Sequence, residues 1–150
     1  MQRENLDLTQ EDGYRALRGH IQDKAQLARE RHGSDLARGD LSGLLEDRDI
    51  VRHPTALVWD SSQLRSGEFG IAKKVEVDGA RSYVLILHEH FTGRGEELAM
   101  VAAYHIPTIN YVDLVTHEEA ELFGATLFGL EVDEYYARVC QLADELARLT

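Results

Sequence analysis

The sequence has a single cysteine, Cys140, and two prolines among its 150 residues. One cysteine excludes an intrachain disulfide and a zinc site built from several cysteines, and its apolar neighbours predict a core thiol. Long apolar runs are also missing: Leu98 to Tyr104, one of the longest, falls far short of the roughly 20 residues that span a bilayer. The N-terminus has acids where a signal peptide carries basic residues. We therefore expect a cytoplasmic protein that does not enter a membrane.

Basic residues are scarce, since Lys and Arg number 16 against 27 Asp and Glu, and the net charge is −11. The imbalance is concentrated in residues 95–150, which carry 2 basic and 11 acidic side chains. Acidic surfaces repel phosphate backbones, which argues against nucleic-acid binding. Only residues 48–94, with 7 basic and 6 acidic side chains, offer a region that could receive an anion.

The length and composition predict one α+β domain over residues 1–150, because 43% apolar and 29% charged residues are typical of a globular chain. A capping pattern at Thr9 starts an amphipathic helix that we expect to end at Gly33. Residues 34–54 show no period and predict an irregular connector. Alternating apolar residues and turn signals then predict a four-stranded, mainly antiparallel meander over residues 55–59, 69–77, 82–91 and 98–106. Two helices follow as a helical hairpin, one capped by Asp113 or Thr116 and ending at Gly129, and one capped by Asp133.

The predicted strand 82–91 is apolar on both faces. Val84 and Ile86 point to one side, and Leu85 and Leu87 point to the other. An antiparallel sheet normally leaves one face to water, so either helices cover both faces or a second copy of the chain covers one. On this ground we expect a homo-oligomer, most simply a homodimer.

The first candidate site is His88-Glu89-His90 at the end of a strand. Residues two apart on a strand share a face, so two imidazoles could reach one metal ion, and the expected pairing places Glu97 opposite His90. The prediction is a divalent metal site of His88, His90 and Glu97. The alternative is that these are polar residues exposed at a strand end.

The second candidate is the eight-residue segment from His117 to Gly124, which resembles the zincin metallopeptidase signature His-Glu-x-x-His-x-x-Gly with Glu121 in place of the second histidine. The resemblance implies that His117 and Glu121 bind zinc and that Glu118 acts as general base. The alternative is a capping box, because Thr116 and Glu119 have the spacing that satisfies a helix N-terminus.

The third candidate is a polar loop after the first strand together with basic residues before that strand. Hydroxyl groups and positive charges suit a small anionic ligand or a carboxylate of a protein partner. The residues are Arg52, His53, Asp60, Ser61, Ser62 and Arg65. The alternative is that the arginines pair with neighbouring acids such as Asp47 and Asp49.

No candidate forms a complete catalytic set. We therefore predict a small cytoplasmic module that binds a ligand or partner around the loop of residues 60–66 and self-associates. The alternative is a metal-dependent hydrolase that uses one of the two histidine sets.

Overall fold

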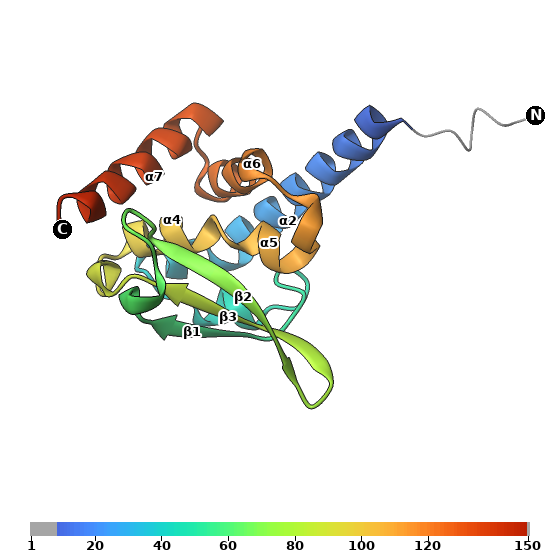
Figure 1. The fold of residues 1–150 in the computed structure, drawn as a ribbon. Coiled ribbons are helices and arrows are strands. Elements are labelled where there is room, and N and C mark those ends of the chain that lie inside the picture. Colours follow the sequence, from blue (N-terminus) through green and yellow to red (C-terminus); the bar gives the residue numbers. More distant parts are fainter. Residues whose placement is uncertain (1–8, 150) are drawn as a thin grey trace, which may run out of the picture.

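The computed structural model describes residues 9–149. In chain order, the helices and strands are α2 (Gln10–Ala37), α3 (Ser42–Glu46), β1 (Thr55–Trp59), β2 (Gly70–Val77), β3 (Ala80–Leu87), α4 (Glu96–Ala103), α5 (Ile106–Tyr111), α6 (His117–Phe128) and α7 (Val132–Ala147). Short 3-10 turns lie at η1 (Ser61–Gln63), η2 (Glu89–Phe91) and η3 (Val112–Leu114). Figure 1 shows the helices gathered above a small sheet, with α7 at one upper edge. None of the described helices is both long enough and apolar enough to cross a membrane.

The sheet has three strands in the order β1-β3-β2, and it is mixed, because β1 pairs with β3 in parallel and β2 pairs with β3 antiparallel. The prediction of a four-stranded antiparallel meander is therefore wrong. Residues 96–103, most of the expected fourth strand, form helix α4 instead. Every residue from Leu98 to Ala103 is buried. A short helix that is apolar all round has no period to separate it from a buried strand.

Local chemistry explains why residues 96–103 are helical. Gly95 takes a positive φ of 65° as the N-cap, and two glutamates occupy the first turn, where they complement the helix dipole. Ala, Leu and Met, which fill the rest of the helix, are strong helix formers. The expected strand 82–91 is also shorter than predicted, since β3 ends at Leu87 and His88 caps η2.

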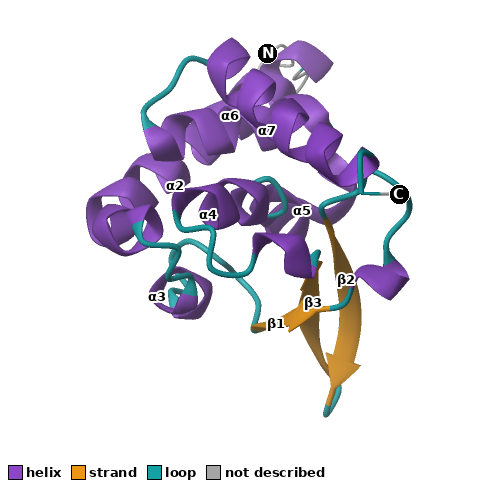
Figure 2. Ribbon diagram, turned by 90° about the vertical axis from the view of Figure 1, so that its left-hand side faces the viewer, coloured by secondary structure: helices purple, strands orange, loops and turns teal. Residues whose placement is uncertain are grey.

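The two faces of the sheet differ in what covers them. Leu57, Leu85 and Leu87 face the helices and belong to the main hydrophobic core or pack against it. On the opposite face, Ile86 pairs with Val58 and Ile71. In Figure 2 the helices lie on one side of the sheet, and the segment between β1 and β2 lies on the other. The apolar second face is thus real, although the pairing from which it was predicted is not, and the homodimer stays a prediction.

Residues 34–54 are more regular than the predicted connector. Helix α2 runs through Gly33 to Ala37, and the left-handed residue that follows its end is Gly39, with a φ of 81°. Residues Ser42–Glu46 then form α3. The predicted helix stop at Gly33 is wrong: glycine often ends a helix, but inside a long, well-packed helix it costs only about 1 kcal/mol.

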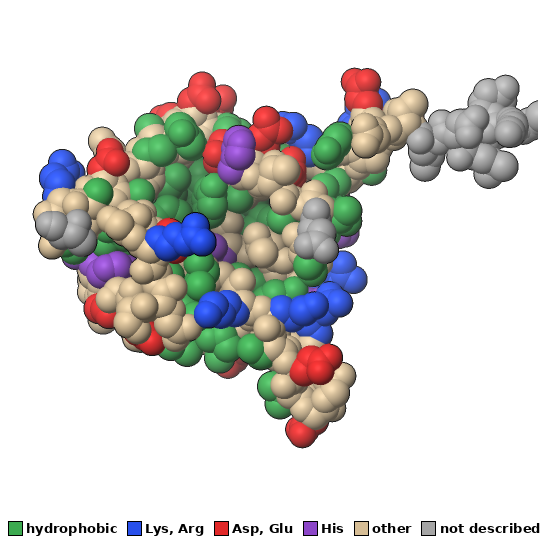
Figure 3. Space-filling model, in the orientation of Figure 1, with side chains coloured by type: hydrophobic (Ala, Val, Ile, Leu, Met, Phe, Trp, Pro, Cys, Tyr) green, Lys and Arg blue, Asp and Glu red, His purple; other side chains and the backbone are tan. Residues whose placement is uncertain are grey.

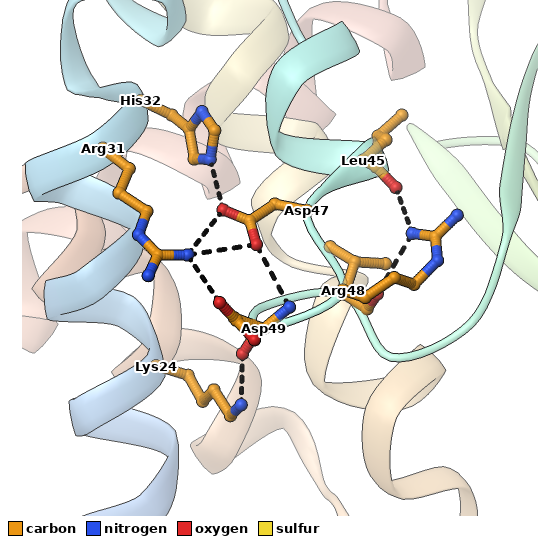
Figure 4. Close-up of polar contacts among 8 residues, drawn as sticks. Lys24, Arg31, His32, Leu45, Asp47, Arg48 and Asp49 are labelled. Atoms are coloured by element: carbon orange, nitrogen blue, oxygen red, sulfur yellow. Dashed lines mark hydrogen bonds and ion pairs between the residues drawn. The ribbon is translucent and has the colours of Figure 1, made fainter.

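A polar network joins α2 to the segment after α3 (Figure 4). The carboxylate of Asp47 accepts hydrogen bonds from Arg31 Nη1 at 3.1 Å and 3.2 Å, and lies 2.8 Å from His32 Nε2. Arg31 also donates to Asp49 at 2.9 Å. Burial raises the pKa of Asp47, but the hydrogen bonds with His32 and Arg31 outweigh it and hold the pKa below its usual value. The acids of this segment therefore pair with α2, while Arg48 donates to the carbonyls of Leu45 and Val51.

Helix α6 begins and ends as the sequence predicts, because Thr116 and Glu119 form a capping box and Gly129 is left-handed. Helix α7 begins at Val132 with Glu131, not Asp133, as its N-cap. Tyr135 fixes α7 against its neighbours, because its hydroxyl donates to the carbonyl of Met100 at 2.7 Å. Gly124 makes room for this ring, since a Cβ there would overlap it. This packing sets the distance between α7, α4 and α6.

Candidate ligand-binding site

A cavity of about 380 Å³ lies between α7, the junction of α4 and α5, and the segment that leads into β2. We call it the aromatic cavity. It is lined by Gly67, Glu68, Phe69, Gly70, Tyr104, His105, Tyr136, Val139, Cys140 and Ala143. Figure 3 shows a hollow lined by hydrophobic side chains on this face of the molecule, between the C-terminal helices above and the sheet below.

His105 forms the innermost polar group of the aromatic cavity. Its ring makes edge-to-face contacts with Phe69 and Tyr104, with centroids 5.5 Å and 5.7 Å away. Its Nε2 atom is buried and has no hydrogen-bond partner among the described residues, although the residue as a whole is half-buried. Burial lowers the pKa of His105 to about 4, so the ring is neutral near pH 7.

Gly70 allows His105 to sit where it does. A Cβ at Gly70 would lie 2.9 Å from His105 Nε2 and 2.6 Å from Leu87 Cδ2, which is too close for either atom. The absent side chain thus lets the first residue of β2 pass directly over the imidazole. Any larger residue would move either the strand or the ring.

Cys140, the single cysteine, lies on the wall of the aromatic cavity and is half-buried. A hydrogen bond with Cys140 raises the pKa of Tyr136 further above neutral pH. Burial, and then the charge of Glu121, does the same for the pKa of Tyr104. Both hydroxyls remain neutral polar groups at the mouth of an otherwise apolar space.

A second cavity, of about 500 Å³, shares Tyr104 and Tyr136 with the first and is completed by His117, Glu121 and Asp133. We call it the acidic cavity. His117 Nδ1 lies 3.4 Å from Glu121 Oε2. Two residues of the predicted zincin-like set are thus brought together, while Glu118 is exposed and lines neither cavity.

The rings of His88 and His90 lie close together, with centroids 6.3 Å apart, but not in the predicted strand geometry. His88 and His90 lie in or beside η2, beyond the end of β3, so they do not share a strand face. His88 Nδ1 accepts a hydrogen bond from the backbone N–H of His90 at 3.1 Å. His90 Nε2 lies 2.9 Å from Arg94 Nη1 and 3.0 Å from Glu145 Oε1.

Arg94 is the centre of this cluster, since it also donates to Glu97 at 2.8 Å. Hydrogen bonds with His90 and then Arg94 hold the pKa of Glu145 below its usual value. A metal ion at His90 Nε2 would have to displace the guanidinium of Arg94, which lies 2.9 Å from that atom. Across residues 9–149 there is no group of three or more His, Cys, Asp or Glu side chains placed to hold a metal ion. Both metal sites stay predictions.

The predicted ligand-binding loop and its basic partners lie at opposite ends of β1. The five residues of that strand span about 17 Å. At one end, burial and then the charges of Arg81, Arg52 and Arg48 lower the pKa of His53. At the other end, Asp60 accepts hydrogen bonds from Ser62 and Gln63, which lower its pKa.

The remaining residues of that loop also bond within the chain. The backbone N–H of Ser61 donates to Glu89 at 3.2 Å, and that of Arg65 donates to Glu68 at 2.7 Å. Only the end of the same segment, Gly67 to Phe69, reaches a cavity wall. The loop therefore contributes to the candidate site through residues that the sequence did not single out.

Sequence reasoning missed the aromatic cavity because each of its walls was interpreted as something else. The sequence places Tyr104 and His105 in the predicted strand 98–106. On α7 the spacing of Tyr136, Val139 and Ala143 indicates a core stripe, yet these residues line the open space. The sequence feature that could have indicated this cavity is Phe69 between Gly67 and Gly70, because glycines let the backbone pass close to another side chain or a ligand.

Comparison of the chain with protein-family models, with curated proteins and with solved structures gave no match.

Proposed function

We propose that this protein binds a small, mainly apolar molecule in the aromatic cavity. A volume of about 380 Å³ lies in the range of ligand pockets, which are mostly apolar with a few polar groups that orient the ligand. Phe69, Val139 and Ala143 supply apolar contacts, and the Tyr104 and Tyr136 hydroxyls supply hydrogen bonds at the mouth.

The observation that carries the proposal is the buried, unpartnered Nε2 atom of His105. A buried polar group without a hydrogen bond costs about 1–3 kcal/mol, and most such groups in native proteins have a partner. Because Gly70 shields Nε2, a donor on the ligand reaches it only when residues 67–70 move. Gly67 and Gly70 permit that movement at low backbone cost.

The proposal is tested by filling the cavity. In Ala143→Phe, a ring replaces the methyl group on the α7 wall, and in Ala137→Phe the same change is made at an exposed position of the same helix. With 1-naphthalenemethanol as a neutral probe, we expect Ala143→Phe to weaken binding by about tenfold or more and Ala137→Phe to leave it unchanged. Titration followed by NMR measures both affinities. Absence of saturable binding to the wild type, or equal binding to both variants, contradicts the proposal.

The proposal retains a cytoplasmic location, for which the single cysteine is the support. It also retains self-association through the sheet face of Val58 and Ile71, because both residues are only half-buried and the segment between β1 and β2, which includes η1, is what lies on that side of the sheet (Figure 2). A sedimentation mass equal to one chain would contradict self-association and would leave ligand binding untouched.

A further inference from the structure

The acidic cavity extends the aromatic cavity past two shared tyrosines. Tyr104 and Tyr136 line both spaces, so a ligand seated against Phe69 and Val139 can continue between the two rings toward α6. What lies beyond the tyrosines differs in kind, because Glu121 and Asp133 are the acidic groups there. The part of a ligand that reaches this space meets carboxylates and aromatic rings.

Glu121 is buried to an unusual degree for a charge with so few contacts. Its side chain is 12% exposed, and its single ionic neighbour is His117, whose side chain is 70% exposed. Among residues 9–149, no side chain or backbone group donates a hydrogen bond to the Glu121 carboxylate. The carboxylate oxygens of Glu121 are not closed off from solvent: they open into the acidic cavity, where a hydrogen-bond donor from outside the protein can reach them.

Glu119 provides the contrast on the same helix. It is also buried, but its carboxylate accepts hydrogen bonds from the backbone N–H and the hydroxyl of Thr116, at 2.7 Å and 2.9 Å. The charge of Glu119 is therefore explained by the capping box. The charge of Glu121 has no comparable structural role, and it faces a cavity that can hold a ligand.

An organic cation fits the walls of the acidic cavity. An ammonium group donates to carboxylates in charge-assisted hydrogen bonds, and it is attracted to the faces of tyrosine rings. An anionic group in the same place would meet two carboxylates with no basic side chain on the wall except His117. The chemistry of the walls thus selects the sign of the ligand's charge.

We infer that the ligand is an apolar organic amine, with its body in the aromatic cavity and its ammonium group beside Glu121 and Asp133. The inference rests on the proposed function, since it names the chemical class of the molecule bound at that same site.

Three probes with the same ring separate this inference from the proposed function: 1-naphthylmethylamine, 1-naphthalenemethanol and 1-naphthoate, which are a cation, a neutral molecule and an anion. We expect the wild type to bind the amine about tenfold more tightly than the alcohol, and the carboxylate most weakly. In Glu121→Gln the amine should fall to the affinity of the alcohol, while the alcohol keeps its own. Retained alcohol binding also shows that the variant is folded.

Glu118→Gln is the matched control, because Glu118 is an exposed acid on the same helix and its replacement changes the net charge by the same amount. It should leave the preference for the amine intact. Equal affinity of amine and alcohol for the wild type overturns the inference, and the proposed function stands if Ala143→Phe still weakens both. If no naphthyl probe binds, both fail. If zinc alone binds and is lost in Glu121→Gln while the three probes bind equally, the inference is overturned in favour of the metal site predicted from the sequence.

Discussion

Asp47 and Glu121 are two carboxylates of nearly equal burial in very different surroundings. Their side chains are 14% and 12% exposed. Asp47 accepts hydrogen bonds from Arg31 and from the backbone N–H of Asp49, and it contacts His32 at 2.8 Å (Figure 4). Glu121 has one ionic contact, at 3.4 Å, to an exposed histidine. Burial alone does not indicate whether a charge stabilises the fold or binds a ligand.

The same difference separates two histidines. The ring of His32 is bonded to Asp47, whereas Nε2 of His105 has no partner among the described residues. The network of Asp47, Arg31 and His32 stabilises the fold, because each buried group there regains hydrogen bonds within the protein. The groups that face the cavities, His105 and Glu121, lack such bonds, which points to a ligand as their partner. The comparison predicts that substitutions in the two regions change the free energy of unfolding by different amounts.

The largest expected effect is the acid sensitivity of His105. Its pKa is about 4 in the folded protein against 6.5 for an ordinary histidine. As pH falls below 6.5 the unfolded chain takes up a proton that the folded protein does not, so stability present above pH 6.5 is lost until about pH 4. The loss from this group is about 3 kcal/mol.

The measurement is the free energy of unfolding of the wild type and of His105→Leu at pH 7 and at pH 4.5. Other groups that titrate in this window, including His53 and the carboxylates, cancel in the difference between the two proteins. The variant should lose less stability on acidification. Parallel pH profiles would contradict the assignment of a buried neutral imidazole.

A smaller effect is expected in the network of Asp47, Arg31 and His32, where the buried groups have hydrogen-bond partners. Asp47→Asn removes the charge shared by Arg31 and His32 while keeping the shape of the side chain. We expect a loss of about 2 kcal/mol in the free energy of unfolding, because charge-assisted hydrogen bonds are replaced by weaker ones around partners that stay in place. Urea unfolding at pH 7 measures it. A change below about 0.5 kcal/mol would show that this network is screened by solvent.

The smallest effect on stability is expected for Glu121→Gln, the equivalent change at the acidic cavity. Removal of a charge that opens into a cavity and has one exposed partner should change the free energy of unfolding by less than about 1 kcal/mol, in either direction. The same urea experiment gives the comparison directly. A loss equal to that of Asp47→Asn would mean that Glu121 stabilises the fold, and the contrast between the two regions would disappear.

Local signals in the sequence predicted both ends of α6 and the bounds of two strands, but not the ends of α2 and β3 or the secondary structure of the most buried segment. The capping box of Thr116 and Glu119 and the stop at Gly129 are visible from residue type and spacing alone. The strands at 55–59 and 70–77 were also visible, within a residue of their observed bounds. Residues 96–103 were not, because a segment buried on every side shows neither the helical nor the strand period.

The candidate site could be predicted only in part for a related reason. His117 and Glu121 lie one helical turn apart, so their proximity follows from the sequence once α6 is assigned. The approach of Tyr104 and His105 to Tyr136 brings together residues about 30 positions apart and depends on Gly124 admitting Tyr135. No local pattern contains that information.

By itself the sequence determined the acidic charge, the single cysteine, the caps of α6 and the strand segments 55–59 and 70–77, since these depend on composition or on residues a few positions apart. Tertiary structure alone decided which buried groups have partners. Asp47 meets Arg31 and His32 of helix α2, 16 and 15 residues earlier in the chain, and Glu121 and His105 meet cavities. Whether a buried polar group finds a hydrogen-bond partner depends on neighbours that only the folded chain brings together.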